Sequence, residues 1–134
     1  MPGNVFTYGS LMFAPVWGRV VRGTYRSAAA QLAGYRRYAL ADDTYPGMVL
    51  QEGASVEGVV YFDVDDADLA ALDHFEGAEY RRCSVLLDTH TPAATAAHTY
   101  VFEAVQRLSQ QPWDPASFAL QRFLDSYCRD KLSD

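Results

Sequence analysis

The sequence is poor in cysteine and has no long apolar run, and both absences narrow the class of protein. Cys83 and Cys128 are its only cysteines, and they lie too far apart for a metal-binding or redox motif. We therefore expect two reduced thiols, as in a cytosolic protein. No apolar run approaches the ~18 residues of a membrane span, and no signal segment precedes the strand-like run that starts at Val5. The sequence predicts a soluble, cytoplasmic protein that does not enter a membrane.

Clustered metal ligands are missing as well. The three histidines, His74, His90 and His98, lack metal-ligand spacing and have no cysteine or carboxylate cluster around them. We therefore expect no metal ion.

Positive charge is also scarce, since the formal net charge is −6. Binding to phosphates requires a basic face, and the pairs Arg36-Arg37 and Arg81-Arg82 are too short to form one. We interpret the first pair as solvated charge on a strand edge. Nucleic acid is therefore excluded as an expected partner, and we expect a small-molecule ligand and a monomer or weak homodimer.

The composition suits one folded domain over residues 1–134, because 49% of the residues are hydrophobic and 13% are aromatic. Strand-like runs with turns between them are expected over residues 5–8, 23–28, 32–40, 48–50, 56–64, 80–87 and 98–103. Loops are expected over residues 89–97 and 110–112. The absence of a βαβ rhythm favours an α+β fold, with a curled, barrel-like, mostly antiparallel sheet and helices at its side.

Three helical segments are expected beside this sheet. Residues 11–21 are apolar but contain Pro15 and Gly18, which indicates a short, broken helix. A second helix is expected after an Asp65-Asp66 cap and should end at Gly77. Asp114-Pro115 should open a third helix, which carries an apolar stripe that we expect to pack on the sheet.

A first candidate site is the segment Tyr8-Gly9-Ser10-Leu11, which follows the first predicted strand. A glycine here lets backbone N–H groups face a cavity without interference from a Cβ atom. Adjacent N–H groups at a turn or helix start can hold a carboxylate. A plain turn between strand and helix would have the same sequence, so both interpretations stay open.

The second candidate is Glu76, at the expected end of the second helix, after Phe75 and before a glycine. The negative end of the helix dipole and an apolar neighbour both favour the protonated carboxyl group. A carboxylate with a raised pKa suits a general base near neutral pH. An exposed glutamate at a helix end is the ordinary alternative.

Tyr80 could donate a hydrogen bond to a substrate or to the glutamate, and Glu79 is a rival for the role of base. Ser10 is not in the Gly-x-Ser-x-Gly context of a nucleophile elbow, and nothing around Cys83 argues for a reactive thiol.

Taken together, these segments resemble the γ-glutamylcyclotransferase-like family. The resemblance covers roughly the first two thirds of the chain. It is carried by Val5-Phe6-Thr7-Tyr8-Gly9-Ser10-Leu11-Met12, Tyr45-Pro46-Gly47, Val56-Glu57-Gly58-Val59-Val60-Tyr61, Leu72-Asp73-x-Phe75-Glu76-Gly77 and Tyr80-x-Arg82. The resemblance implies a small barrel-like mixed sheet with flanking helices.

It also implies the roles of the residues. Tyr8, Gly9, Ser10 and Leu11 would hold a γ-glutamyl group, and Tyr80 would shape the pocket. Glu76 would act as general acid and base in an enzyme that releases 5-oxoproline and a free amine or amino acid. The resemblance implies a chemistry that needs no cofactor. Two alternatives stay open, namely a non-catalytic γ-glutamyl-binding or regulatory module, and a related lyase or acyl-transfer enzyme.

Overall fold

The computed structural model describes residues 3–40, 46–89 and 95–113. In chain order its elements are β1 (Gly3–Thr7), the 3-10 helix η1 (Ser10–Met12), α1 (Ala14–Val20), β2 (Ser27–Leu40), β3 (Pro46–Val64), α2 (Asp66–Glu76), β4 (Tyr80–Thr89), β5 (Thr95–Phe102), the 3-10 helix η2 (Val105–Arg107) and β6 (Leu108–Pro112). The predicted short, broken helix is confirmed as η1 followed by α1. The predicted third helix and Cys128 lie outside the described residues.

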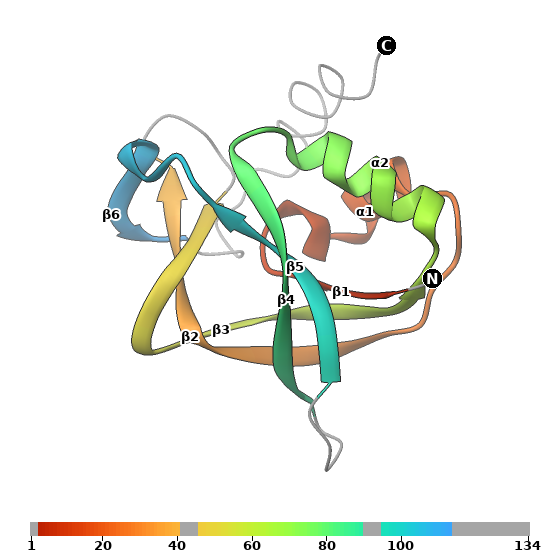
Figure 1. The fold of residues 1–134 in the computed structure, drawn as a ribbon, viewed down its shortest axis with the longest axis horizontal. Helices are drawn as coiled ribbons and strands as arrows, with labels where there is room; N and C mark the ends of the chain where they lie inside the picture. Colours follow the sequence, from red (N-terminus) through yellow and green to blue (C-terminus); the bar gives the residue numbers. More distant parts are fainter. Residues whose placement is uncertain (1–2, 41–45, 90–94, 114–134) are drawn as a thin grey trace.

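The strands form one sheet that curls back on itself, with the order β3-β1-β5-β4-β2-β6 and a further pairing between β2 and β3 (Figure 1). The pairing of β1 with β5 is parallel, and the other strand pairs are antiparallel. The expected α+β class, with a barrel-like, mixed and mostly antiparallel sheet, is confirmed. Helices α1 and α2 lie next to each other on one side of the sheet.

The longest strands, β2 and β3, differ from the prediction of several short runs. They have 14 and 19 residues and pair from Ser27↔Tyr61 to Ala39↔Pro46. Gly34 and Gly53 fall inside them with φ of +87° and +83°, so the glycines bend the strands without ending them. Residues 23–26, expected in a strand, precede β2.

β6 is a second correction, because a loop was expected at residues 110–112. This strand pairs with β2, and it is this tertiary pairing, rather than strand propensity, that makes its Gln- and Pro-containing sequence extended.

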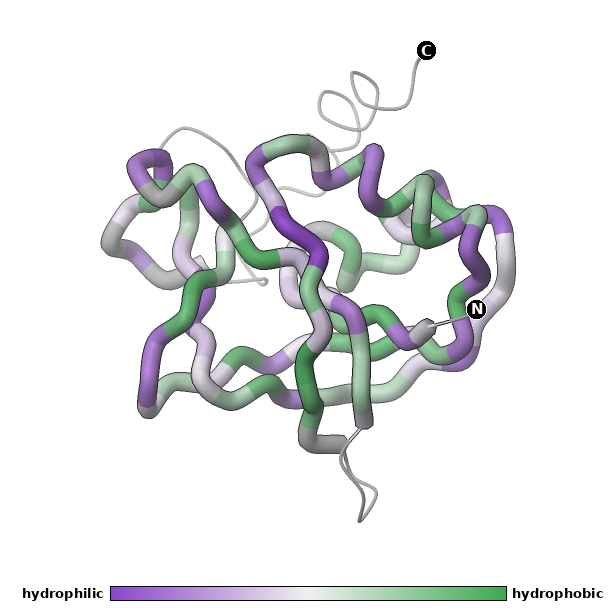
Figure 2. The backbone as a smooth tube through the Cα atoms, in the orientation of Figure 1, coloured by the Kyte–Doolittle hydropathy of each residue, from purple (hydrophilic) through white to green (hydrophobic). Residues whose placement is uncertain are grey.

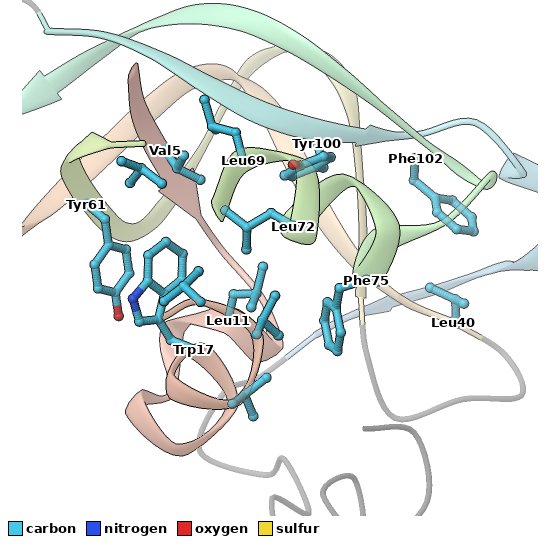
Figure 3. Close-up of a cluster of buried hydrophobic side chains, with 14 residues drawn as sticks. Val5, Leu11, Trp17, Leu40, Tyr61, Leu69, Leu72, Phe75, Tyr100 and Phe102 are labelled. Carbon is cyan, nitrogen blue, oxygen red and sulfur yellow. The ribbon is translucent and has the colours of Figure 1, made fainter. Parts of the chain in front are cut away.

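Side chains that alternate along β1 divide the interior into two clusters. Val5 belongs to a cluster between the sheet and the helices, and the next residue, Phe6, belongs to one inside the curled sheet. Hydrophobic and hydrophilic stretches also alternate along the other strands (Figure 2). In the helix-side cluster the rings of Trp17 and Tyr61 stack face to face, with centroids 3.7 Å apart (Figure 3). β1 therefore lies between the two halves of the core.

Helix α2 has the ends that the sequence predicts. The side chain of Asp65 accepts a hydrogen bond from the Asp68 N–H at 2.8 Å, and Gly77 caps the last turn with φ of +82°. Leu72 and Phe75 are buried against the sheet. Among the described residues, no helix is long and apolar enough to cross a membrane.

Candidate active site

A narrow cavity opens where the end of β1 meets the end of α2. Its lining consists of Phe6, Thr7, Tyr8, Gly9, Leu11, Pro46, Phe75, Glu76, Tyr80 and Tyr100. Water-sized molecules can occupy about 20 Å³ of it, which is room for roughly one water. Apart from Ser10, the structure brings every residue singled out from the sequence as a site residue to this cavity. Ser10 is the first residue of η1, and its side chain lies outside the described part of the structure.

The turn after β1 forms one wall of the cavity. The Met12 N–H donates to the Gly9 carbonyl at 3.0 Å and closes a tight turn. The N–H groups at the start of such a turn have no acceptor within it, so they are suited to an external acceptor. A Cβ atom on Gly9 would lie 2.8 Å from Cγ of Pro46, which itself lines the cavity. Glycine is therefore required here because Pro46 comes close.

Tyr8 and Tyr100 connect this wall to β5. The Tyr8 hydroxyl donates to the backbone carbonyl of Tyr100, with 2.5 Å between the oxygens. Burial raises the pKa of Tyr8 well above its usual value, and the negative charge of Glu76 raises it further. Burial, together with Asp73 and Glu76, likewise raises the pKa of Tyr100. Both hydroxyls therefore remain protonated hydrogen-bond donors at neutral pH.

The last turn of α2, which carries Glu76, is fixed to the sheet. The Tyr100 hydroxyl donates to Oδ1 of Asp73 at 2.7 Å, and Nε of Arg82 lies 3.5 Å from the same oxygen. The Gly77 N–H donates to the Asp73 carbonyl at 3.1 Å and ends the helix. As the final residue of α2, Glu76 is held at the cavity by contacts one turn earlier.

Tyr80, the first residue of β4, also lines the cavity. Its hydroxyl donates to the Pro46 carbonyl at 2.8 Å, and its ring meets Phe102 edge-on, with centroids 5.0 Å apart. Tyr80 therefore holds the start of β3 against the cavity.

The rival carboxylate, Glu79, lies elsewhere. It forms an ion pair with Arg107, and its carbonyl accepts the Glu103 N–H at 2.7 Å. Glu79 is not part of the cavity lining, whereas Glu76 is.

Two residues of this region were missed from the sequence. Tyr100 could have been found, because positions 98, 100 and 102 share one face of the predicted strand at residues 98–103. Arg37 was interpreted as solvated charge, yet its Nη1 donates to the Tyr8 carbonyl at 2.6 Å. No local pattern in the sequence signals that contact, because it joins two segments that are distant in the chain.

The described residues support neither a metal site nor a reactive thiol. Across residues 3–40, 46–89 and 95–113, no group of three or more histidine, cysteine or acidic side chains could hold a metal ion. Cys83 is partly buried, and burial raises the pKa of its thiol, which disfavours the reactive thiolate.

Known proteins resemble this chain in sequence over most of its length. Residues 5–117 match the model of a family described as gamma-glutamyl cyclotransferase, AIG2-like. AIG2-like protein D of Arabidopsis thaliana is 33% identical over 101 residues, which cover 74% of this chain and 66% of that protein. Protein AIG2 C of the same plant is 38% identical over 82 residues, covering 61% and 50%. The chain thus spans about half to two thirds of the length of these relatives.

Solved structures show the same fold. A solution structure from Arabidopsis thaliana aligns with a TM-score of 0.73 and 28% identity, covering 97% of this chain and 82% of that chain. A structure titled gamma-glutamyl cyclotransferase aligns with a TM-score of 0.65 over 76% of this chain and 67% of that chain. At 18% identity, the second likeness shows the fold alone.

Proposed function

This chain belongs to the gamma-glutamyl cyclotransferase, AIG2-like family, and we propose that it releases 5-oxoproline and a free amine or amino acid from a γ-glutamyl compound. One observation carries the proposal. Glu76, the only acidic side chain among the described residues that line the cavity, borders the same cavity as the turn at Tyr8, Gly9 and Leu11. The proposed base and the turn proposed to bind the substrate therefore border one small space.

The reaction is a ring closure within the substrate. The substrate's α-amine attacks its own γ-carbonyl carbon, a C–N bond forms, and the bond to the leaving amine breaks. The nucleophile and the carbonyl belong to one molecule, so closure of the five-membered ring has a proximity advantage.

Glu76 is proposed to carry the protons. Its carboxylate takes a proton from the substrate's ammonium group, which frees the amine to attack. The resulting carboxylic acid delivers that proton to the departing nitrogen, and the regenerated carboxylate takes the second proton that the attacking nitrogen loses as it becomes the lactam nitrogen. This proton passes to the freed amine, which leaves as an ammonium ion, so the glutamate ends the cycle ionised.

The turn after β1 is proposed to bind the γ-glutamyl group. Backbone N–H groups at Gly9, Ser10 and Leu11 would hold the α-carboxylate or polarise the γ-carbonyl. The tyrosines Tyr8 and Tyr80 shape the walls.

We also propose where the protein acts and with what. Its partner is a small-molecule γ-glutamyl substrate rather than nucleic acid or a membrane, and it works in the cytoplasm without a cofactor, as a monomer or weak homodimer. The net charge of −6 supports the exclusion of nucleic acid.

The test is production of 5-oxoproline from a panel of γ-glutamyl amines and dipeptides, with α-glutamyl analogues as negative controls. Glu76→Gln keeps the size of the side chain and removes the base, so its rate should fall by about 10²- to 10⁴-fold. Glu79→Gln is the matched control, because Glu79 pairs with Arg107 outside the cavity, and it should stay within a few-fold of the wild type. Wild-type turnover by Glu76→Gln would refute the mechanism.

A second candidate function is a γ-glutamyl-binding or regulatory module without turnover, because the names of the plant relatives, AIG2-like protein D and Protein AIG2 C, state no enzymatic activity. In calorimetry such a protein would bind a γ-glutamyl compound, and long incubation would release no amine. Release of amine that depends on Glu76 decides for the enzyme.

A further inference from the structure

Arg37, on β2, reaches the turn that forms one wall of the cavity. Its Nη1 lies 2.6 Å from the Tyr8 carbonyl oxygen and 3.7 Å from Sδ of Met12. The same nitrogen lies 3.3 Å from the Glu57 carbonyl oxygen on β3. One guanidinium group therefore ties both ends of the turn at residues 8–12 to the sheet behind it.

The guanidinium is itself held in place. Its carbon lies 5.1 Å from the ring centroid of Trp113, a buried residue, in the geometry of a cation–π contact. A long side chain that is fixed by a ring and by several acceptors loses little further freedom when it orients a neighbouring peptide group.

The orientation of that peptide group matters for the cavity. None of the described peptide bonds is cis, so the bond between Tyr8 and Gly9 is trans. In a planar trans peptide, the carbonyl and the following N–H point in opposite directions. Because the Tyr8 carbonyl points to Arg37, the Gly9 N–H points away from Arg37. Tyr8 and Gly9 line the cavity, whereas Arg37 does not.

The charge adds to this effect. A hydrogen bond from a cationic donor polarises the peptide, and a polarised N–H is a stronger donor to an anion. In a chain with a net charge of −6, a nearby cation also offsets the repulsion of an anionic ligand.

We propose that Arg37 is a positioning residue that fixes the Tyr8–Gly9 peptide so that the turn at residues 8–12 offers its N–H groups to an anionic or polarised group of the substrate. This proposal rests on the proposed function, because it assigns the turn a substrate-binding role.

The neighbouring arginine provides the matched control. Arg36 is exposed, its guanidinium carbon lies 5.3 Å from the Tyr38 ring centroid, and within residues 3–40 it forms no hydrogen bond with the turn. Arg36→Gln and Arg37→Gln therefore remove the same charge from the same strand, but only the second loses the contact with Tyr8.

Steady-state kinetics on a γ-glutamyl substrate supply the first test. Arg37→Gln should lower kcat/KM by about 10- to 100-fold, the loss expected for one hydrogen bond to a charged group, while Arg36→Gln stays within two-fold of the wild type. A rise in KM alone would mean that the turn binds the substrate's carboxylate. A fall in kcat would mean that the turn binds the reacting carbonyl. Arg37→Lys keeps the charge without the fork of donors, so it should recover only part of the loss.

The backbone amide of Gly9 supplies a readout that does not depend on activity. In ¹⁵N NMR spectra of the folded protein, Arg37→Gln should shift the Gly9 amide resonance and speed its hydrogen exchange, and Arg36→Gln should leave both unchanged. If the wild type forms no 5-oxoproline, the proposed function fails while the Gly9 signal still tests the role of Arg37 in the turn. If Arg37→Gln does not fold, Arg37→Lys takes its place in both measurements. The proposal is overturned if a folded Arg37 variant has the same kinetics, the same Gly9 amide resonance and the same Gly9 hydrogen exchange as Arg36→Gln.

Discussion

The hydroxyl of Tyr100 and the carboxylate of Asp73 are 2.7 Å apart, and their hydrogen bond joins β5 to the last turn of α2. The ring of Tyr100 is buried, while the Asp73 carboxylate is partly exposed to solvent and is also approached by Arg82. The bond therefore fixes the part of the helix that presents Glu76 to the cavity.

Removing this bond should weaken both the fold and the site. Tyr100→Phe keeps the ring and loses the donor, so the free energy of unfolding should fall by about 1 kcal/mol in urea titration. The rate of 5-oxoproline formation should fall by more than the loss of folded protein accounts for, because the last turn of α2, which carries Glu76, is no longer bonded to Tyr100. Arg81→Gln is the control, since it breaks an exposed pair with Glu103 and should cost less than about 0.5 kcal/mol. Equal unfolding energies and rates for the Tyr100 variant and the wild type would contradict the assigned link.

Gly9 should not tolerate a methyl group. In Gly9→Ala the new Cβ would lie 2.8 Å from Cγ of Pro46, so either the turn or β3 must shift, at a cost of about 1–3 kcal/mol. Thermal unfolding measures this cost. Gly18→Ala is the control, because no atom lies within 4 Å of its Cβ position in α1 and alanine favours helix by up to ~1 kcal/mol. A Gly9 variant as stable as the wild type would mean that the turn and Pro46 are not closely packed.

Stability should decline in acid through Asp68, a buried carboxylate on α2. It accepts the Arg22 and Gly23 N–H groups at 2.9 Å each, and the Tyr25 hydroxyl at 2.5 Å. Burial acts to raise the pKa of Asp68, but these hydrogen bonds outweigh burial and hold the pKa below its usual value.

The sign follows from that direction. The folded state binds the proton of Asp68 less readily than the unfolded state, so its contribution to stability is complete above the unfolded pKa and is lost as the pH falls below about 4. Asp68→Asn should lower the free energy of unfolding by about 1–3 kcal/mol at neutral pH and should flatten its decline between about pH 5 and 3. Urea titrations at several pH values measure both, with the exposed Asp63→Asn as control. An acid decline as steep in the Asp68 variant as in the wild type would assign the effect to another group.

The contact between α2 and the sheet depends on Leu72, which is completely buried. Leu72→Ala leaves a cavity and should cost about 2–5 kcal/mol in urea titration. The same substitution at Leu86, which is 68% exposed, should change stability by less than about 0.5 kcal/mol. Similar losses at both positions would contradict the assignment of the core.

The sequence could predict features that are specified locally. The Asp65 cap and the Gly77 stop bound α2 correctly because capping depends on a few adjacent residues. The turn at Tyr8 and Gly9 was likewise found from a strand followed by glycine, and it does line a cavity.

The rest depends on contacts between distant segments. The sequence predicted separate runs at residues 23–28 and 32–40, and at 48–50 and 56–64. Pairing between β2 and β3 instead continues each strand through Gly34 and Gly53. β6 is extended because β2 offers it a partner. The contacts of Tyr100 and Arg37 with Tyr8 join segments that are distant in the chain. The period of the predicted strand could place Tyr100 on one face, but no local motif reveals that either residue contacts Tyr8.

The place of β1 between β3 and β5 has a consequence for how the protein is made. Both partners of this strand are synthesised after it, so β1 can pair with β3 only after residues 46–64 have left the ribosome, and with β5 only after residues 95–102 have followed. Contacts between residues so far apart in the chain form slowly. The long loop between them must close, at a cost in conformational entropy, before the contacts can stabilise the fold. The cavity is therefore assembled late in folding, and β1 is exposed to chaperones, proteases and wrong partners for longer than the segments that it finally joins.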